Sequence, residues 1–222
     1  MEKIAPKKEW SVAIRYNHWL MAASIFVLIA TGFYIAAPFT VSGGETVGKF
    51  TMGEVRFWHI LFGVILSFLF LWRLYLAFFS RFHADWKDFF AWTNWKNSVK
   101  QVRFYMLISK EPPEHTHLYG PLQSLAYAGL LFMVLLIVLT GWILMGAGYG
   151  AGLTALIYKL VKPLENGLGG LAMVRWIHHI LMWGFILFFA VHIYMAFWYD
   201  VIFREGTVSS MISGMVFRRS HE

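Results

Sequence analysis

The sequence predicts an all-α integral membrane protein, a four-helix bundle with both termini on the cytoplasmic side. Of its 222 residues, 59% are apolar and only 14% are charged, which is far from the balance of soluble domains. Four apolar stretches each have the length of about 20 helical residues that a bilayer crossing needs. We expect them to form a single domain over residues 1–222.

The four predicted spans are bounded by helix-breaking residues or by charge. They cover about 17–38, 56–79, 122–147 and 171–199. Pro38 closes the first span, the pair Gly120 and Pro121 opens the third, and several glycines follow the third. At about 1.5 Å per residue, each span covers a hydrocarbon core of about 30 Å.

The basic residues orient these spans. Most of the 19 lysines and arginines lie in the N-terminal tail, between spans two and three, and in the C-terminal tail. By the positive-inside rule these three segments are cytoplasmic. The formal charge of +7 therefore reflects membrane topology, and we expect no nucleic-acid partner. The central segment, 83–117, is either an amphipathic stretch on the inner membrane surface or a solvated connector.

Histidines inside three of the spans are the main functional signal, because an ionisable side chain in hydrocarbon is costly. In the predicted topology, His18 lies near the cytoplasmic face and His59 near the outer face. In span four, His178 and His179 lie toward the outer face and His192 toward the cytoplasmic face. The histidines thus form two pairs matched in depth, as two b-type haems with bis-histidine ligation require.

Helix geometry favours His178 over His179 as the ligand that pairs with His59. His178 and His192 are 14 residues apart, which brings them to within about 40° of the same helix face and about 21 Å apart along the axis. His179 falls about 140° away from His192. We expect His179 to make a helix–helix contact or a haem-propionate contact, and it remains the alternative ligand.

Other residue types limit the alternatives. The chain has no cysteine, which excludes disulfides, covalent c-type haem and cysteine-bound iron–sulfur clusters. The spans contain essentially no carboxylates, which argues against a carboxylate-based transporter. Glycines such as Gly32, Gly63 and Gly141 could make room for a flat macrocycle, although close helix packing explains them equally well.

Four stretches with distinctive motifs occur in order along the chain: 15–19 (RYNHW), 52–59 (MGEVRFWH), 192–196 (HIYMA) and 200–208 (DVIFREGTV). In these stretches the chain resembles the b-type cytochrome subunit of membrane-bound nickel–iron uptake hydrogenases. The resemblance covers nearly the whole chain. The chain departs from the family at 119–121, where Tyr-Gly-Pro replaces the His-Asn-Pro of many members.

The resemblance implies a multi-pass protein of the prokaryotic inner membrane that anchors the small and large hydrogenase subunits, with the small subunit in direct contact. It also implies two non-covalent haems b with iron axial ligands His59 and His178 (outer haem) and His18 and His192 (inner haem). Electrons would pass from hydrogen to a membrane quinone, so the chain would transfer electrons without activating hydrogen itself. Tyr194, Asp200 and Arg204 are candidate quinone-binding residues, or else an interfacial tyrosine and a surface ion pair.

Two other functions remain open at this point. The same cytochrome module could serve another dehydrogenase, such as a formate dehydrogenase. A protein of a different class, either a cofactor-free membrane anchor or a metal-ion transporter, would use the histidines without haem.

Overall fold

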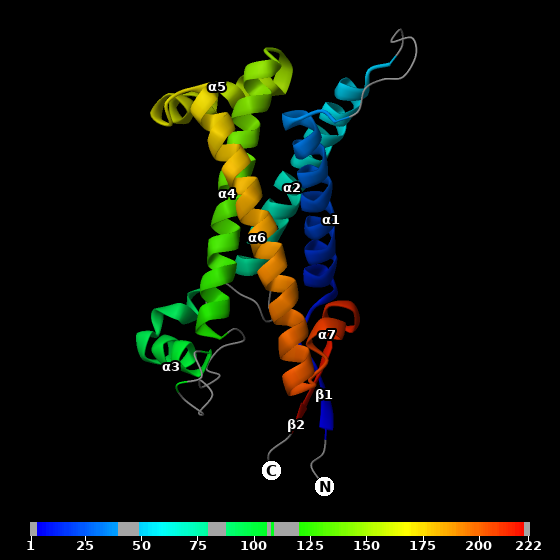
Figure 1. Ribbon diagram of the computed structural model, residues 1–222, viewed down its shortest axis with the longest axis vertical. Coiled ribbons are helices and arrows are strands. Elements are labelled where there is room, and N and C mark those ends of the chain that lie inside the picture. Colours follow the sequence, from blue (N-terminus) through cyan, green and yellow to red (C-terminus); the bar gives the residue numbers. More distant parts are fainter. Residues whose placement is uncertain (1–3, 40–48, 80–87, 106–107, 109–119, 220–222) are drawn as a thin grey trace. The chain divides into compact units, whose positions relative to one another are not determined.

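The computed structural model describes residues 4–39, 49–79, 88–105, 108 and 120–219 (Figure 1). Four long helices dominate it: α1 (Val12–Ala36), α2 (Thr51–Phe79), α4 (Pro121–Gly148) and α6 (Leu171–Phe203). All four are long and apolar enough to cross a membrane. The prediction of four apolar helices of membrane-spanning length is thereby confirmed. The exact bounds of the spans stay a prediction; α1, for example, begins before residue 17 and ends at Ala36, before Pro38.

The chain divides into two compact units, which are described separately. The bundle unit contains residues 17–72 and 135–184, and the terminal unit contains residues 1–16, 73–134 and 185–222. Each of the four long helices contributes to both units. A single domain over residues 1–222 stays a prediction.

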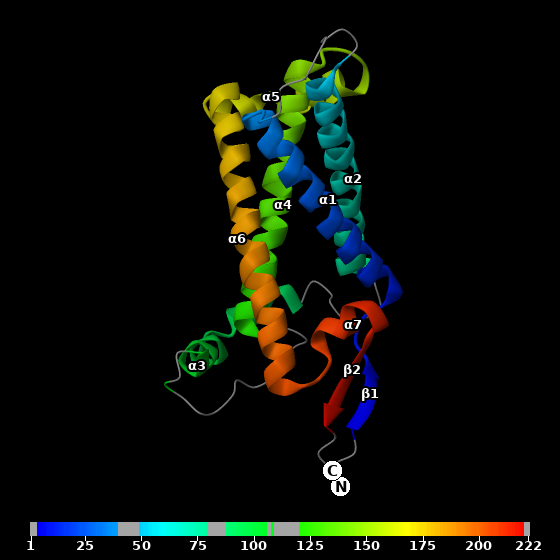
Figure 2. The ribbon, with the colours of Figure 1, turned by 45° about the vertical axis from the view of Figure 1, so that its right-hand side comes forward.

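Specific side-chain contacts connect the helices of the bundle unit. Figure 2 shows the course of these helices. The side-chain amide of Asn17 on α1 donates to the Leu69 carbonyl of α2 at 2.9 Å. The indole of Trp142 on α4 donates to the Ser67 hydroxyl of α2 at 3.1 Å. Such buried polar contacts are favourable in hydrocarbon, where water cannot satisfy the same groups.

A fifth helix of the bundle unit, α5 (Gly152–Gly167), was not predicted from the sequence. It runs across the end of α4 (Figure 1). Gly146 allows this contact, because a Cβ there would come within 2.6 Å of the Tyr158 Cβ. The leucines of α5 repeat at helical spacing on its exposed side: Leu153, Leu156, Leu160 and Leu164.

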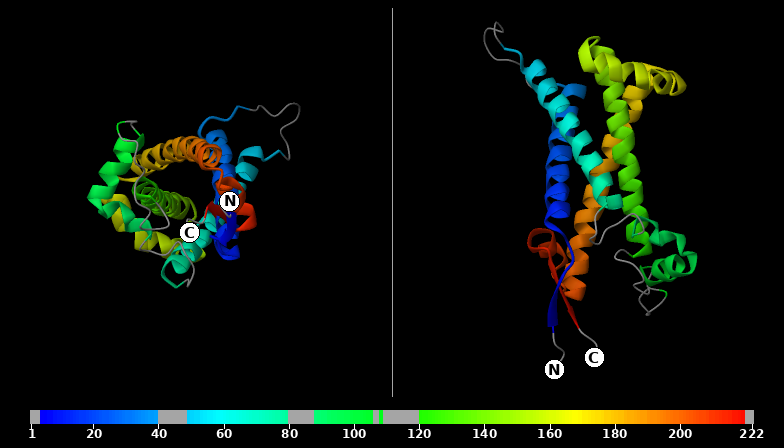
Figure 3. Two further views of the ribbon diagram at one scale, coloured as in Figure 1. Left: turned by 90° about the horizontal axis from the view of Figure 1, so that it is seen from below. Right: turned by 180° about the vertical axis from the view of Figure 1, so that it is seen from behind.

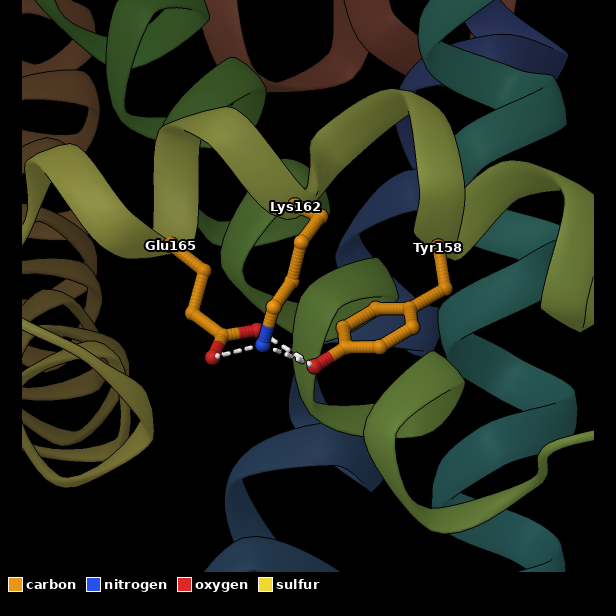
Figure 4. Close-up of polar contacts among 3 residues, drawn as sticks. All are labelled: Tyr158, Lys162 and Glu165. Atoms are coloured by element: carbon orange, nitrogen blue, oxygen red, sulfur yellow. Dashed lines mark hydrogen bonds and ion pairs between the residues drawn. The ribbon is translucent and has the colours of Figure 1, made fainter.

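Three polar side chains on α5 form a closed set of contacts (Figure 4). Lys162 Nζ lies 2.7 Å from Glu165 Oε1, and the Tyr158 hydroxyl donates to Glu165 Oε2 at 2.6 Å. The Lys162 ammonium and the Tyr158 hydroxyl hold the pKa of the Glu165 carboxyl below its usual 4.5. The hydrogen bond of Lys162 to Glu165, and to a smaller extent its hydrogen bond to Tyr158, raise the pKa of Lys162 above its usual 10.5.

These pKa shifts predict how the stability of α5 depends on pH. The stabilisation from Glu165 is present above its unfolded pKa and is lost as the pH falls through the lowered folded pKa. The stabilisation from Lys162 is present below its unfolded pKa and is lost as the pH rises through the raised folded pKa. We therefore expect amide hydrogen exchange in α5 to quicken below about pH 4.5, after correction for intrinsic rates. Glu165→Gln should remove this acid step, and an acid step that persists in the variant would contradict its assignment.

The terminal unit joins the two ends of the described chain. Strand β1 (Ile4–Lys8) pairs antiparallel with β2 (Met215–Arg219), as Figure 3 shows, with Lys8 opposite Met215. The short helix α7 (Thr207–Ser213) precedes β2, and its Ser210 hydroxyl accepts a hydrogen bond from the Trp10 indole at 3.0 Å. Gly214 has φ 84°, and a Cβ there would lie 3.0 Å from the Trp10 carbonyl oxygen, so the turn between α7 and β2 requires glycine.

The 3-10 helix η1 (Asp88–Thr93) and helix α3 (Trp95–Tyr105) lie within the central segment. Both are attached to the start of α4. The Gln101 side-chain oxygen accepts the Leu122 amide at 2.8 Å, and the Ser124 hydroxyl accepts the Trp92 amide at 2.9 Å. Part of the central segment is therefore helical, whereas its histidines, His83, His115 and His117, lie outside the described residues.

Candidate haem site

Two histidines face each other inside the bundle unit. His59 lies near the start of α2 and His178 near the start of α6, and their ring centroids are 6.3 Å apart with the ring planes at 67°. Both side chains are half-buried. Both are among the histidines predicted to bind haem, and both belong to the bundle unit.

The spacing of the two rings fits one metal between them. An imidazole nitrogen binds a metal at about 2 Å, and two rings on opposite sides of one metal then have centroids about 6 Å apart. Among the described residues, no group of three or more His, Cys, Asp or Glu side chains gathers as a metal-ion site would require. Two imidazoles alone match the axial ligands of a haem, whose other iron ligands come from the macrocycle.

Two threonines, not singled out from the sequence, contact these histidines. The Thr31 hydroxyl of α1 lies 2.8 Å from His59 Nδ1. The Thr140 hydroxyl of α4 lies 2.8 Å from His178 Nδ1. In both cases Nδ1 is engaged by protein, which leaves Nε2 as the nitrogen available for iron.

The glycines noted from the sequence differ in their surroundings. A Cβ at Gly32 would touch His59 Cε1 at 3.4 Å, and a Cβ at Gly141 would touch His178 Cε1 at 3.5 Å. Each imidazole therefore lies directly against the backbone of a neighbouring helix. By contrast, apart from the adjoining backbone of α2 and the two neighbouring residues, no described atom comes within 4 Å of a Cβ built at Gly63, one turn after His59. This open space beside His59 is where a flat macrocycle could fit.

His179 has a different environment from its neighbour His178. It is exposed, and its Nε2 accepts a hydrogen bond of 3.4 Å from the Trp183 indole on the same helix. This contact lies within α6, so the helix–helix or haem-propionate contact expected for His179 stays a prediction. The choice of His178 as the iron ligand stays a prediction, which the contact of His178 with His59 supports.

The two histidines of the predicted inner pair belong to different units, so their pairing also stays a prediction. His18, in the bundle unit, makes an edge contact with the ring of Trp19, with 5.1 Å between centroids. His192, in the terminal unit, stacks on Phe188 at 5.4 Å and lies 6.2 Å from the ring of Tyr127 on α4.

The candidate quinone residues lie near the end of α6. Tyr194 is 63% exposed. The Asp200 carboxylate accepts the backbone amide of Thr207 at the start of α7, and Arg204 takes a left-handed conformation (φ 53°) just after α6 ends. Asp200 therefore helps to hold the turn from α6 to α7, and a quinone role for any of the three stays a prediction.

The fold and the facing histidines together define a class of protein, the membrane-embedded b-type cytochromes, whose haem is held without a covalent bond. The model of the family described as Prokaryotic cytochrome b561 matches residues 9–214. The chain therefore belongs to this family, and it is a multi-pass protein of the prokaryotic inner membrane.

Individual relatives agree with the family assignment. A relative from Rhodobacter capsulatus is 34% identical over 92% of this chain and 79% of its own length. One from Azotobacter chroococcum is 33% identical over 92% of this chain and 86% of its own. One from Escherichia coli is 27% identical over 94% of this chain and 88% of its own. The first two are named "Probable Ni/Fe-hydrogenase B-type cytochrome subunit", and the third is named "Probable Ni/Fe-hydrogenase 1 B-type cytochrome subunit".

Proposed function

We propose that this chain is the dihaem membrane anchor and electron-transfer subunit of a nickel–iron hydrogenase, and that it passes electrons from a periplasmic hydrogenase to a membrane quinone. The observation that carries the proposal is the His59–His178 pair, with ring centroids 6.3 Å apart on two membrane helices. The names of the relatives support the hydrogenase as the partner. Hydrogen itself is activated on another subunit.

Four histidines hold the two haems in this proposal. His59 and His178 bind the outer haem, and His18 and His192 bind the inner haem. His178 and His192 are about 21 Å apart along α6, since a helix rises about 1.5 Å per residue. This separation places one haem toward each membrane face.

The bound haem supplies a one-electron redox centre, and the chain's residues determine where that centre sits. The imidazoles of His59 and His178 fix it near the face where the partner hydrogenase docks, since positive-inside topology places the start of α2 outside. The apolar helices around the pair exclude water from it. Toward the other end of α6, Tyr194 would hydrogen-bond a quinone oxygen through its hydroxyl and deliver a proton; its exposed side chain supports this role.

Haem quantitation of the purified chain tests this function first. We expect about two haems b per polypeptide by pyridine haemochrome, with a reduced-minus-oxidised spectrum typical of b-type cytochromes. Absence of haem from folded protein, expressed with an adequate haem supply, would overturn the proposal and favour a cofactor-free anchor or a metal-ion transporter.

Partner identity needs a separate measurement. In membranes of the native host, we expect an affinity-tagged chain to co-purify with the hydrogenase subunits. We also expect hydrogen to reduce its haems in that complex. Co-purification with a formate dehydrogenase, and haem reduction by formate alone, would assign the cytochrome to that enzyme.

A further inference from the structure

A threonine–glycine pair occurs once beside each histidine of the outer site. Thr31 and Gly32 on α1 face His59, and Thr140 and Gly141 on α4 face His178. The two hydroxyl-to-Nδ1 distances are both 2.8 Å. The two clusters come from different helices, and the corresponding atoms make the same contacts in each.

The direction of these hydrogen bonds follows from the other contacts of the threonines. The Thr31 hydroxyl donates to the Val27 carbonyl at 2.7 Å, and the Thr140 hydroxyl donates to the Leu136 carbonyl at 2.8 Å. A hydroxyl has one proton but can accept further hydrogen bonds. A threonine within a helix ordinarily donates this proton to the carbonyl one turn earlier, and we therefore infer that the hydroxyl oxygen accepts the Nδ1–H of the histidine.

We propose that Thr31 and Thr140 are positioning residues that hold both ligands of the outer haem in the Nδ1–H tautomer and aim their Nε2 atoms at the iron. This inference rests on the proposed haem function. It assigns to each histidine a hydrogen-bond acceptor on a helix that supplies no ligand to that haem. Gly32 and Gly141 complete each cluster, because the absence of a side chain lets the imidazole edge lie against the helix.

The hydrogen bonds should also set the redox potential of the outer haem. An imidazole that donates its Nδ1–H to an acceptor is a more basic ligand, and a basic ligand favours ferric over ferrous iron. Loss of either acceptor should therefore raise the potential of the outer haem. If the site's preference for ferric over ferrous iron falls tenfold, the redox potential of this one-electron centre rises by about 59 mV.

Valine variants test this role, since valine keeps the shape of threonine but lacks the hydroxyl. We expect both Thr31→Val and Thr140→Val to raise the redox potential of the outer haem. Each variant should also bind this haem at least about tenfold more weakly. The potential of the inner haem should stay unchanged. Potentiometric titration with optical and low-temperature EPR detection measures both haems without reference to turnover.

Two sets of variants separate the hydrogen bond from packing. Thr31→Ser and Thr140→Ser keep the hydroxyl and should restore the wild-type potential. Ser24→Ala removes a comparable bond within α1, the 2.7 Å contact of the Ser24 hydroxyl with the Leu20 carbonyl, and should leave the outer haem unchanged. Equal effects in the valine and serine variants would indicate packing alone and would overturn the inference.

The result also separates this inference from the proposed function. Wild-type protein without haem would refute the function. Wild-type protein with two haems, and valine variants with unaltered potentials, would refute the threonine role alone.

Discussion

Replacing His59 with alanine is expected to remove one haem from the protein and leave the other in place. His59 and His178 are the two imidazoles brought together in the bundle unit, so loss of one leaves the outer iron with a single protein ligand. The haem is held by no covalent bond, because the chain has no cysteine. Haem content should therefore fall from about two to about one per chain.

Substitution of His18 should give the complementary result. We expect His18→Ala to remove the inner haem and to retain the outer one. In the predicted topology His18 lies near the cytoplasmic face of the membrane, whereas His59 lies near the outer face. His178→Ala should reproduce the His59 phenotype, and His192→Ala the His18 phenotype. The four variants would then sort into two pairs with distinct remaining spectra.

His179 provides a matched control for these variants. It is adjacent to His178 on α6, but its ring is exposed and bonded to Trp183. His179→Ala should keep both haems, as judged by pyridine haemochrome and by the α-band positions at low temperature. Equal partial loss of both spectral species from the His59 and His18 variants would contradict the depth pairing.

Much of the membrane architecture could be predicted from local composition. A bilayer crossing needs about 20 apolar residues, and each of the four stretches that met this requirement is a helix in the structure. The preference for His178 over His179 as the iron ligand, which stays a prediction, also came from local geometry. Adjacent residues on a helix point about 100° apart, so two neighbouring histidines cannot both face the same partner.

Helix α5 shows why the segment between spans three and four was misread. No helix was predicted in this segment, although the structure forms α5 over Gly152–Gly167. However, the spacing of Leu153, Leu156, Leu160 and Leu164 is helical, and this pattern could have identified an amphipathic helix. The Tyr158–Lys162–Glu165 contacts at spacings of four and three residues also support that helix. A stricter count of periodicity would have found it.

The pairing of β1 with β2 is a different case. These strands lie at opposite ends of the chain, with Lys8 opposite Met215. A strand of five residues carries little periodic signal, and β1 contains Pro6. Only the three-dimensional arrangement of the terminal unit brings these two segments together, so the sequence alone could not reveal the pairing.

The threonines of the outer site were missed for a third reason. A threonine within a membrane helix ordinarily bonds the carbonyl one turn earlier, as Thr31 and Thr140 both do. Nothing in a single helix shows that the same hydroxyl also accepts from a histidine on another helix. The repeated Thr-Gly pair in α1 and α4 was the available signal, but its meaning depends on which helices lie next to each other.

Gly63 offers the most direct test of where the outer haem lies. Apart from the adjoining backbone of α2 and its two neighbouring residues, a Cβ at Gly63 meets no described atom within 4 Å, although the residue follows His59 by one helical turn. Close helix packing therefore does not account for this glycine, in contrast to Gly146, where the Tyr158 Cβ would clash. Glycine also costs a helix about 1 kcal/mol relative to alanine. We infer that the space beside Gly63 admits the haem ring.

Gly63→Leu should fill this space without disturbing the protein around it. We expect the variant to fold with unchanged helix content and to keep the inner haem, but to lose the outer haem because leucine occupies the place of the ring. The matched control is Gly129→Leu on α4, since a Cβ there likewise meets no described atom within 4 Å. The control should keep both haems. If Gly63→Leu also retained two haems, the open space beside His59 would be a lipid-facing surface, and the outer haem would approach His59 from another side.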